Sequence, residues 1–154
     1  MNRCSATLAF LALLAPARPL AGQIQVTGMR DLNFGAVVRG VQTSVLPTDP
    51  IKSGRFYLFY VAGGRIQLRM TLPTVLNRVG GGGTMPVDFK NGDAFIQGTA
   101  PGSPPNSINP VANTNFDFGA NPDANLWLGG RVLPSGTQAA GAYKGTVVLT
   151  VNVF

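Results

Sequence analysis

The final stretch of the chain, GAYKGTVVLTVNVF (141–154), carries the clearest structural signal in the sequence. From residue 143 onward, alternate positions are apolar or glycine, and the other positions are mostly polar. This period of two, combined with β-branched residues, is typical of a strand that buries one face. A chain end normally frays, so an orderly strand here predicts that the stretch closes the fold or an interface. Its apolar face consists of Tyr143, Gly145, Val147, Leu149, Val151 and Val153.

The composition extends this strand pattern to the whole chain. The 154 residues include 20 glycines and 12 prolines, and only 12% are charged. This suits strands and turns and is poor material for exposed helices. About nine short strand-like runs are separated by turn signals, which predicts an all-β antiparallel β-sandwich of about seven to nine strands. We expect residues 23–154 to form this sandwich as a single domain.

Several local patterns give more specific expectations. Residues 32–38 alternate and predict a short strand, and residues 65–72 predict a half-buried strand with Ile66 and Leu68 facing inward. The dipeptide Asn91-Gly92 separates two strand-like runs, which predicts a two-residue hairpin turn.

The N-terminus has the three-part pattern of a secretory signal peptide, predicted over residues 1–22. Arg3 supplies the positive charge, residues 4–15 form an apolar run too short to anchor the chain in a bilayer, and small residues follow. Cleavage is expected after Ala17, Ala21 or Gly22. The protein is therefore predicted to be exported to the periplasm, cell surface or extracellular space, with no transmembrane segment in the mature chain.

The residue types that are missing limit the possible chemistry. The sequence has no histidine and no glutamate, and its one cysteine, Cys4, lies in the predicted leader. No catalytic, cofactor-binding or metal-binding residues are therefore predicted, and the protein is expected not to be an enzyme. Without the leader, ten scattered basic residues face six aspartates, a net charge of +4 with no basic run, so no nucleic-acid partner is expected.

Four motifs in a fixed order carry a resemblance to a known family. They are LNFG (32–35), TMPVDF (84–89), LWLGGRVL (126–133) and the final GAYKGTVVLTVNVF. Together they resemble exported bacterial domains of unknown function that are similar to spore coat protein U and to archaic chaperone–usher pilins. Gly141 and Phe154 match a glycine and a terminal aromatic that pilins carry. Phe154 is last rather than penultimate, however, and the mature chain lacks the cysteine pair common in such pilins.

The resemblance implies an Ig-like or pilin-like sandwich that serves as a fimbrial subunit and assembles by β-strand exchange. The implied partners are other copies of the chain and a periplasmic chaperone and usher. The candidate donor strand is residues 23–29, with Ile24, Val26 and Met29, and the candidate acceptor or closing strand runs from Gly141 to Phe154.

One alternative stands beside strand exchange. In this alternative, Ile24 and Val26 form the first strand of their own domain, which makes the domain self-complete. The protein is then an extracellular binding module for a glycan or another surface ligand, and its aromatic residues either form such a surface or belong to the core. Those aromatics are Tyr57, Phe59, Tyr60 and Trp127.

Overall fold

The structure is a computed structural model that describes residues 23–154, so the predicted signal peptide lies outside the described residues. Within this part of the chain there are thirteen strands and no helix, and every strand pairing is antiparallel. The all-β antiparallel sandwich predicted from the sequence is confirmed.

The strands form three sheets. Sheet 1 has the order β1 (Ile24–Arg30), β3 (Gly54–Tyr60), β10 (Asp123–Leu128), β7 (Ala94–Gly98) and β8 (Asn106–Ile108). Sheet 2 has the order β12 (Tyr143–Lys144), β5 (Val75–Arg78), β6 (Thr84–Asp88), β11 (Gly130–Val132) and β2 (Thr43–Val45). Sheet 3 has the order β13 (Val148–Val153), β4 (Arg65–Thr71) and β9 (Thr114–Asp117).

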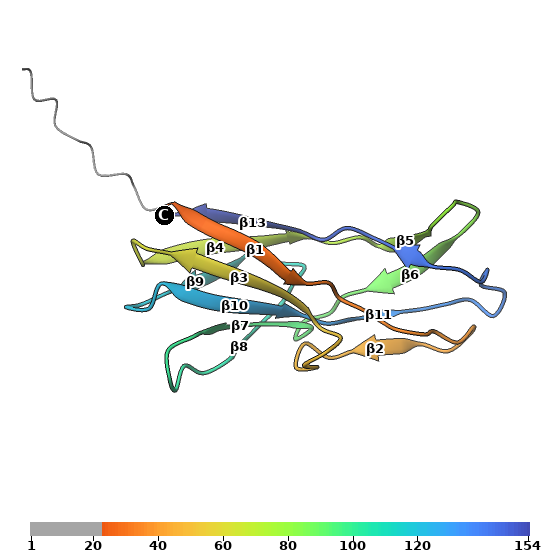
Figure 1. The fold of residues 1–154 in the computed structure, drawn as a ribbon, viewed down its shortest axis with the longest axis horizontal. Helices are drawn as coiled ribbons and strands as arrows, with labels where there is room; N and C mark the ends of the chain where they lie inside the picture. Colours follow the sequence, from red (N-terminus) through yellow and green to blue (C-terminus); the bar gives the residue numbers. More distant parts are fainter. Residues whose placement is uncertain (1–22) are drawn as a thin grey trace, which may run out of the picture.

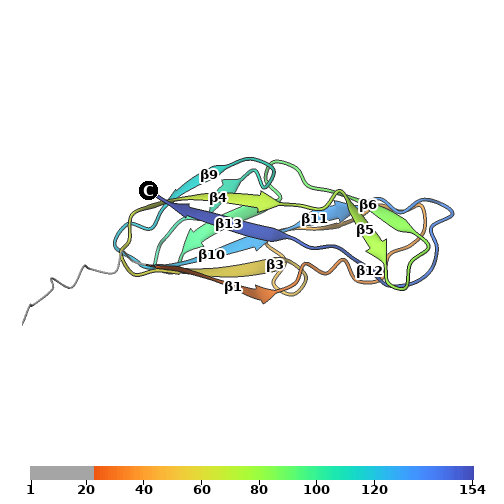
Figure 2. The ribbon, with the colours of Figure 1, turned by 90° about the horizontal axis from the view of Figure 1, so that it is seen from above.

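Sheets 1 and 3 face each other in one half of the elongated molecule, and sheet 2 forms the other half (Figure 1). Figure 2 shows β1 and β3 on one side of this half and β4, β9 and β13 on the other. The chain passes between the halves six times, most directly from β10 into β11 and from β12 into β13. These crossings divide continuous stretches into separate strands, which explains why the number of strands exceeds the expected seven to nine.

The break between β10 and β11 depends on a glycine. A side chain at Gly129 would place its Cβ 2.3 Å from the carbonyl oxygen of Val45 and 2.7 Å from the nitrogen of Pro47. Only glycine permits such a close approach of two backbones. Gly129 therefore lets the chain pass β2 as it enters sheet 2.

One hydrophobic core joins the facing sheets. On β4, Ile66 and Leu68 are fully buried and alternate with exposed or half-buried polar residues, as the sequence predicted. The central strand β3 contributes Leu58, and all three are apolar side chains whose burial is the main stabilising term of the fold. The other large side chains that are almost completely buried are Ile96, Leu126, Leu128 and Val132.

Two local predictions were wrong. Residues 32–38 form no strand, although Leu32, Phe34 and Val37 do pack against the core. At Asn91-Gly92 a turn is present, with Gly92 at a φ of 87° and Asp93 N–H donating to the Lys90 carbonyl. It is not a hairpin, because β6 before it pairs within sheet 2 and β7 after it pairs within sheet 1.

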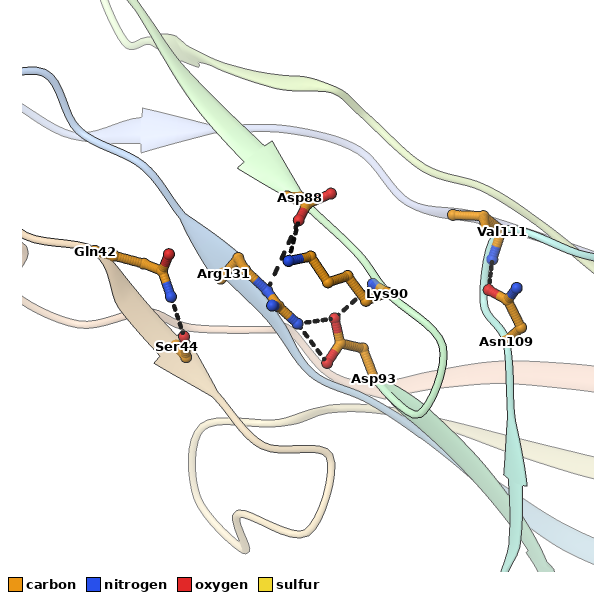
Figure 3. Close-up of polar contacts among 8 residues, drawn as sticks. All are labelled: Gln42, Ser44, Asp88, Lys90, Asp93, Asn109, Val111 and Arg131. Carbon is orange, nitrogen blue, oxygen red and sulfur yellow. Dashed lines mark hydrogen bonds and ion pairs between the residues drawn. The ribbon is translucent and has the colours of Figure 1, made fainter.

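An ion pair fixes this corner between the sheets. The Arg131 guanidinium on β11 lies 2.8 and 3.1 Å from the two carboxylate oxygens of Asp93, and its Nε lies 3.9 Å from Asp88 (Figure 3). Asp93 also accepts a hydrogen bond from the backbone N–H of Lys90 at 2.6 Å. The side chains of Arg131 and Asp93 are only 20% and 13% exposed, so water screens the pair weakly.

We expect Asp93→Asn to lower the free energy of unfolding by about 1–3 kcal/mol, because the half-buried guanidinium loses its charged partner. Urea denaturation measures this as a lower midpoint with an unchanged slope. The matched control is Asp117→Asn, which removes the 55% exposed partner of Arg65 and should change stability by less than about 1 kcal/mol. Equal effects of the two variants would contradict a special role for the corner pair.

Candidate strand-accepting groove

Two sheet edges on the same side of the molecule have no neighbouring strand. β1 pairs with β3 alone, and β13 pairs with β4 alone. Both strands lie along the upper edge of the molecule in Figure 1 and run in opposite directions, and Figure 2 shows that they belong to the two facing layers. Each therefore presents a row of backbone donors and acceptors toward the space between them.

The candidate donor residues lie in β1, which pairs with β3 of the same chain from Ile24 opposite Tyr60 to Gly28 opposite Phe56. This strand is poorly buried. Val26 is 39% exposed and Met29 54%, while Ile24 packs against the core. As a donor, β1 would first have to leave β3.

Arg30 fixes the end of β1 to the loop before β3. Its Nε donates to the Ser53 carbonyl at 2.7 Å, and its terminal nitrogens donate to Ser53 Oγ at 2.8 Å and to the carbonyl of Pro50. Asp49 orders this loop by accepting the N–H groups of Ile51 and Lys52, both at 2.8 Å. These N–H donors lower the pKa of the Asp49 carboxyl.

The predicted closing strand is present but only half covered. It is divided into β12 and β13, and residues 145–147 between them belong to no strand. Its core-facing side chains are half-buried rather than buried, and Phe154 is 75% exposed. The half-buried members that pack against the core are Tyr143, Val147, Leu149 and Val151.

A groove of about 900 Å³ opens between the stretch that follows β1 and the stretch that leads into β13. Residues in or beside the strands of sheets 1 and 2 form its apolar floor. Its two walls are residues 31–39 and 138–147. The largest apolar floor residues are Phe56, Leu76, Met85, Val87, Phe89, Leu128 and Val132.

Residues 31–39 pair with no strand, and residues 138–147 pair only with β5, through β12. In residues 31–39, Asn33 N–H donates to the Lys52 carbonyl at 2.8 Å, but none of the N–H groups of residues 36–39 donates to a carbonyl of the described chain. Leu32 and Phe34 nevertheless point their side chains toward the core, as strand residues do. This alternation ends after Phe34, because Val37 packs against the core and Val38 is exposed.

Tyr143 holds the opposite wall against sheet 2. Its hydroxyl donates to the carbonyl of Ala139 at 2.7 Å and accepts from the amide of buried Gln138 at 2.6 Å. That amide also donates to the carbonyl of Thr84 in β6 at 3.0 Å. These bonds tie this wall of the groove to β6.

Glycines allow this wall to run close to β5. A Cβ at Gly145 would lie 2.7 Å from a methyl carbon of Leu76, and one at Gly141 would lie 2.8 Å from Nε of Arg78. Gly141 also has a φ of 144°, which side chains disfavour. Arg78 Nε donates to the carbonyl of Ala140 at 2.8 Å, so the same contact fixes the start of the wall.

A second surface of interest is the outer face of sheet 1. Tyr57, Phe59 and Trp127 are half-buried there, whereas Tyr60 belongs to the core. The Trp127 ring stacks on Phe95 of β7 with 4.5 Å between the ring centroids. The guanidinium of Arg55 on β3 lies 5.6 Å from the Trp127 ring centroid.

Hydrogen bonds order the polar groups of this face. The Tyr57 hydroxyl donates to the carboxylate of Asp123, which raises the pKa of the Tyr57 phenol. Nε and one terminal nitrogen of Arg55 donate to Asn125 Oδ1 at 3.0 and 2.8 Å. The face therefore combines aromatic rings with fixed polar groups.

Neither a metal site nor a membrane-spanning helix is found within residues 23–154. No group of three or more acidic, histidine or cysteine side chains is placed to hold a metal ion there. Residues 23–154 also contain no helix of the length and apolar character that a membrane span requires.

We expect Gly141→Ala to destabilise the fold by about 1–3 kcal/mol, because the new methyl group meets Arg78 in a disfavoured backbone conformation. Thermal unfolding measures the loss. Gly136→Ala is the control, since a Cβ there has open space and no positive φ. If both variants melt at the same temperature, Gly141 has no special structural role.

Comparisons with known proteins give limited information. No protein-family model matches the sequence, and no curated protein is similar to it at a significant level. The fold is similar to a chain from a solved structure described as "Chaperone-tip adhesin complex is vital for synergistic activation of CFA/I fimbriae biogenesis". The TM-score is 0.47 with 11% sequence identity, over 84% of this chain and 40% of that chain. This chain thus spans well under half of that protein's length, and a likeness this distant carries no functional argument.

Proposed function

We propose that the protein is an exported, non-enzymatic subunit of a surface assembly, with a fimbrial subunit as the specific form. A neighbouring subunit inserts one extended strand into the groove, between residues 31–39 and 138–147. The strand hydrogen-bonds to one or both walls and buries alternate side chains against the floor, which is recognition by β-augmentation.

The observation that carries this proposal is an apolar floor between two walls that each keep an unpaired edge, because residues 31–39 pair with no strand and β12 pairs with β5 alone. Backbone donors and acceptors are normally paired, and an exposed apolar groove of this size marks a binding site. An extended peptide pairs with the backbone of the walls and also covers the apolar floor, whereas a small ligand covers the floor without pairing the walls. On the opposite side of the sandwich, residues 109–113 connect the edge strands β8 and β9.

We expect Val147→Asp to remove the protein from surface fibres, because a carboxylate in the groove opposes insertion of an apolar strand. The measurement is the amount of protein in the fibre fraction sheared from cells that produce it. Val148→Asp is the matched control, since Val148 is 49% exposed and does not line the groove.

Thermal unfolding of both purified variants separates a loss of assembly from a loss of folding. The proposal fails if Val147→Asp folds and still enters the fibre fraction. It fails equally if unmodified protein is found only as a compact monomer, free of any partner.

The aromatic outer face of sheet 1 favours a second candidate function, an extracellular glycan-binding module. Aromatic rings beside fixed carboxylate, amide and guanidinium groups suit a sugar, which offers both apolar C–H faces and hydroxyls. The pairing of β1 with β3 in the same chain is also what a self-complete module requires.

For this candidate we expect Phe59→Ala to weaken glycan binding about tenfold, because the ring of Phe59 is half exposed on this face. A glycan array followed by calorimetry on any ligand found gives the affinity. Phe154→Ala removes a 75% exposed aromatic elsewhere and should leave binding unchanged. An array without a ligand, or equal losses in both variants, would rule this candidate out.

A further inference from the structure

The charged residues that line the groove are mostly basic. Arg30, Arg39 and Lys144 stand against a single acid, Asp31. None of the four forms an ion pair within the described residues. A strand lying between the walls would therefore meet a positive rim on its outward side.

The apolar floor sets the other half of the ligand's chemistry. It presents large side chains such as Phe56, Met85 and Phe89. Because alternate residues of a strand point to opposite faces, an inserted strand places every second side chain on this floor. The fitting strand has large apolar residues at those positions and acidic residues between them.

The chain's own β1 does not fit this description. Its inward positions in the present pairing are Ile24, Val26 and Gly28, so the third offers no side chain. Its only charged residue is Arg30, which would bring a cation to a basic rim. The hydrogen bonds of Arg30 to the loop before β3 also hold β1 in place.

No other acidic strand of this chain is free to be donated. Of the six aspartates, Asp31 belongs to the groove itself. The other five are engaged by partners within their own chain: Asp49, Asp88, Asp93, Asp117 and Asp123. A second copy thus has no unengaged acidic strand in residues 23–154.

We propose that the strand that fills the groove comes from a different polypeptide, and that it alternates large apolar residues with acidic ones. This inference rests on the proposed function, which supplies the inserted strand. It replaces a homopolymer by contact between unlike subunits, with the basic rim selecting the partner.

Binding of synthetic peptides to the full mature protein tests the inference. One peptide of about seven residues, about 23 Å when extended, alternates isoleucine with aspartate. A second has asparagine in place of each aspartate, and a third is the chain's own segment 23–30. Fluorescence anisotropy gives each affinity at low and at near-physiological ionic strength.

We expect the aspartate peptide to bind about tenfold more tightly than the asparagine peptide at low salt, with a smaller ratio as salt shortens the Debye length to about 8 Å. The double variant Arg39→Gln/Lys144→Gln should remove most of this ratio. Arg69→Gln, an exposed cation on β4 that does not line the groove, should preserve it.

The possible failures are distinguishable. If the two designed peptides bind equally, or if segment 23–30 binds most tightly, the acidic partner is wrong and strand acceptance by the groove still stands. If no peptide binds, or if Val147→Asp binds every peptide as well as unmodified protein does, both this inference and the proposed function are wrong.

Discussion

The structure depends on one constraint, which is that the backbone groups of a strand need a neighbour on each side or a reason to face water. On one side of the sandwich, residues 109–113 connect the edge strands β8 and β9, which each have a single neighbour. On the other side, β1 and β13 each have a single neighbour, and an apolar groove opens beyond their ends. Tyr143, Val147 and Leu149 are only half-buried, and no strand within residues 23–154 pairs with the outer edge of β12 or β13.

The sequence predicted those parts of the fold that depend on which side chains are buried. Alternation placed Ile66 and Leu68 correctly in the core, and the same pattern found the closing strand. It failed at residues 32–38, because alternation reports the direction of side chains and does not report whether a neighbouring strand exists. It also failed at Asn91-Gly92, where the turn formed but the flanking strands joined different sheets, a choice that the Arg131 to Asp93 contact stabilises over a long sequence separation.

The candidate site could be predicted only in part, because the alternation of side chains does not report which strands are neighbours. The stretch from Gly141 to Phe154 was identified from its pattern, and the contacts of Gly141 and Gly145 with β5 explain why glycine stands at those positions. The groove itself is made by residues from most of the chain, so no local pattern reveals it. The segment at residues 32–38 and the groove are linked, because this segment forms one wall of the groove and the N–H groups of residues 36–39 have no carbonyl partner within residues 23–154. In the proposed function, an inserted strand supplies those partners.

The most direct test of an unfilled strand position is amide hydrogen exchange, measured residue by residue in the free protein and in the assembled form. Exchange reports whether an N–H is hydrogen-bonded and how often that bond opens. We expect rapid exchange of residues 36–39 and 145–147 in free protein, beside protected amides in β3 and β4, and strong protection of at least one of the two segments after assembly. Protection of both segments in the free protein, or rapid exchange of both in the assembled form, would rule out an unfilled strand position.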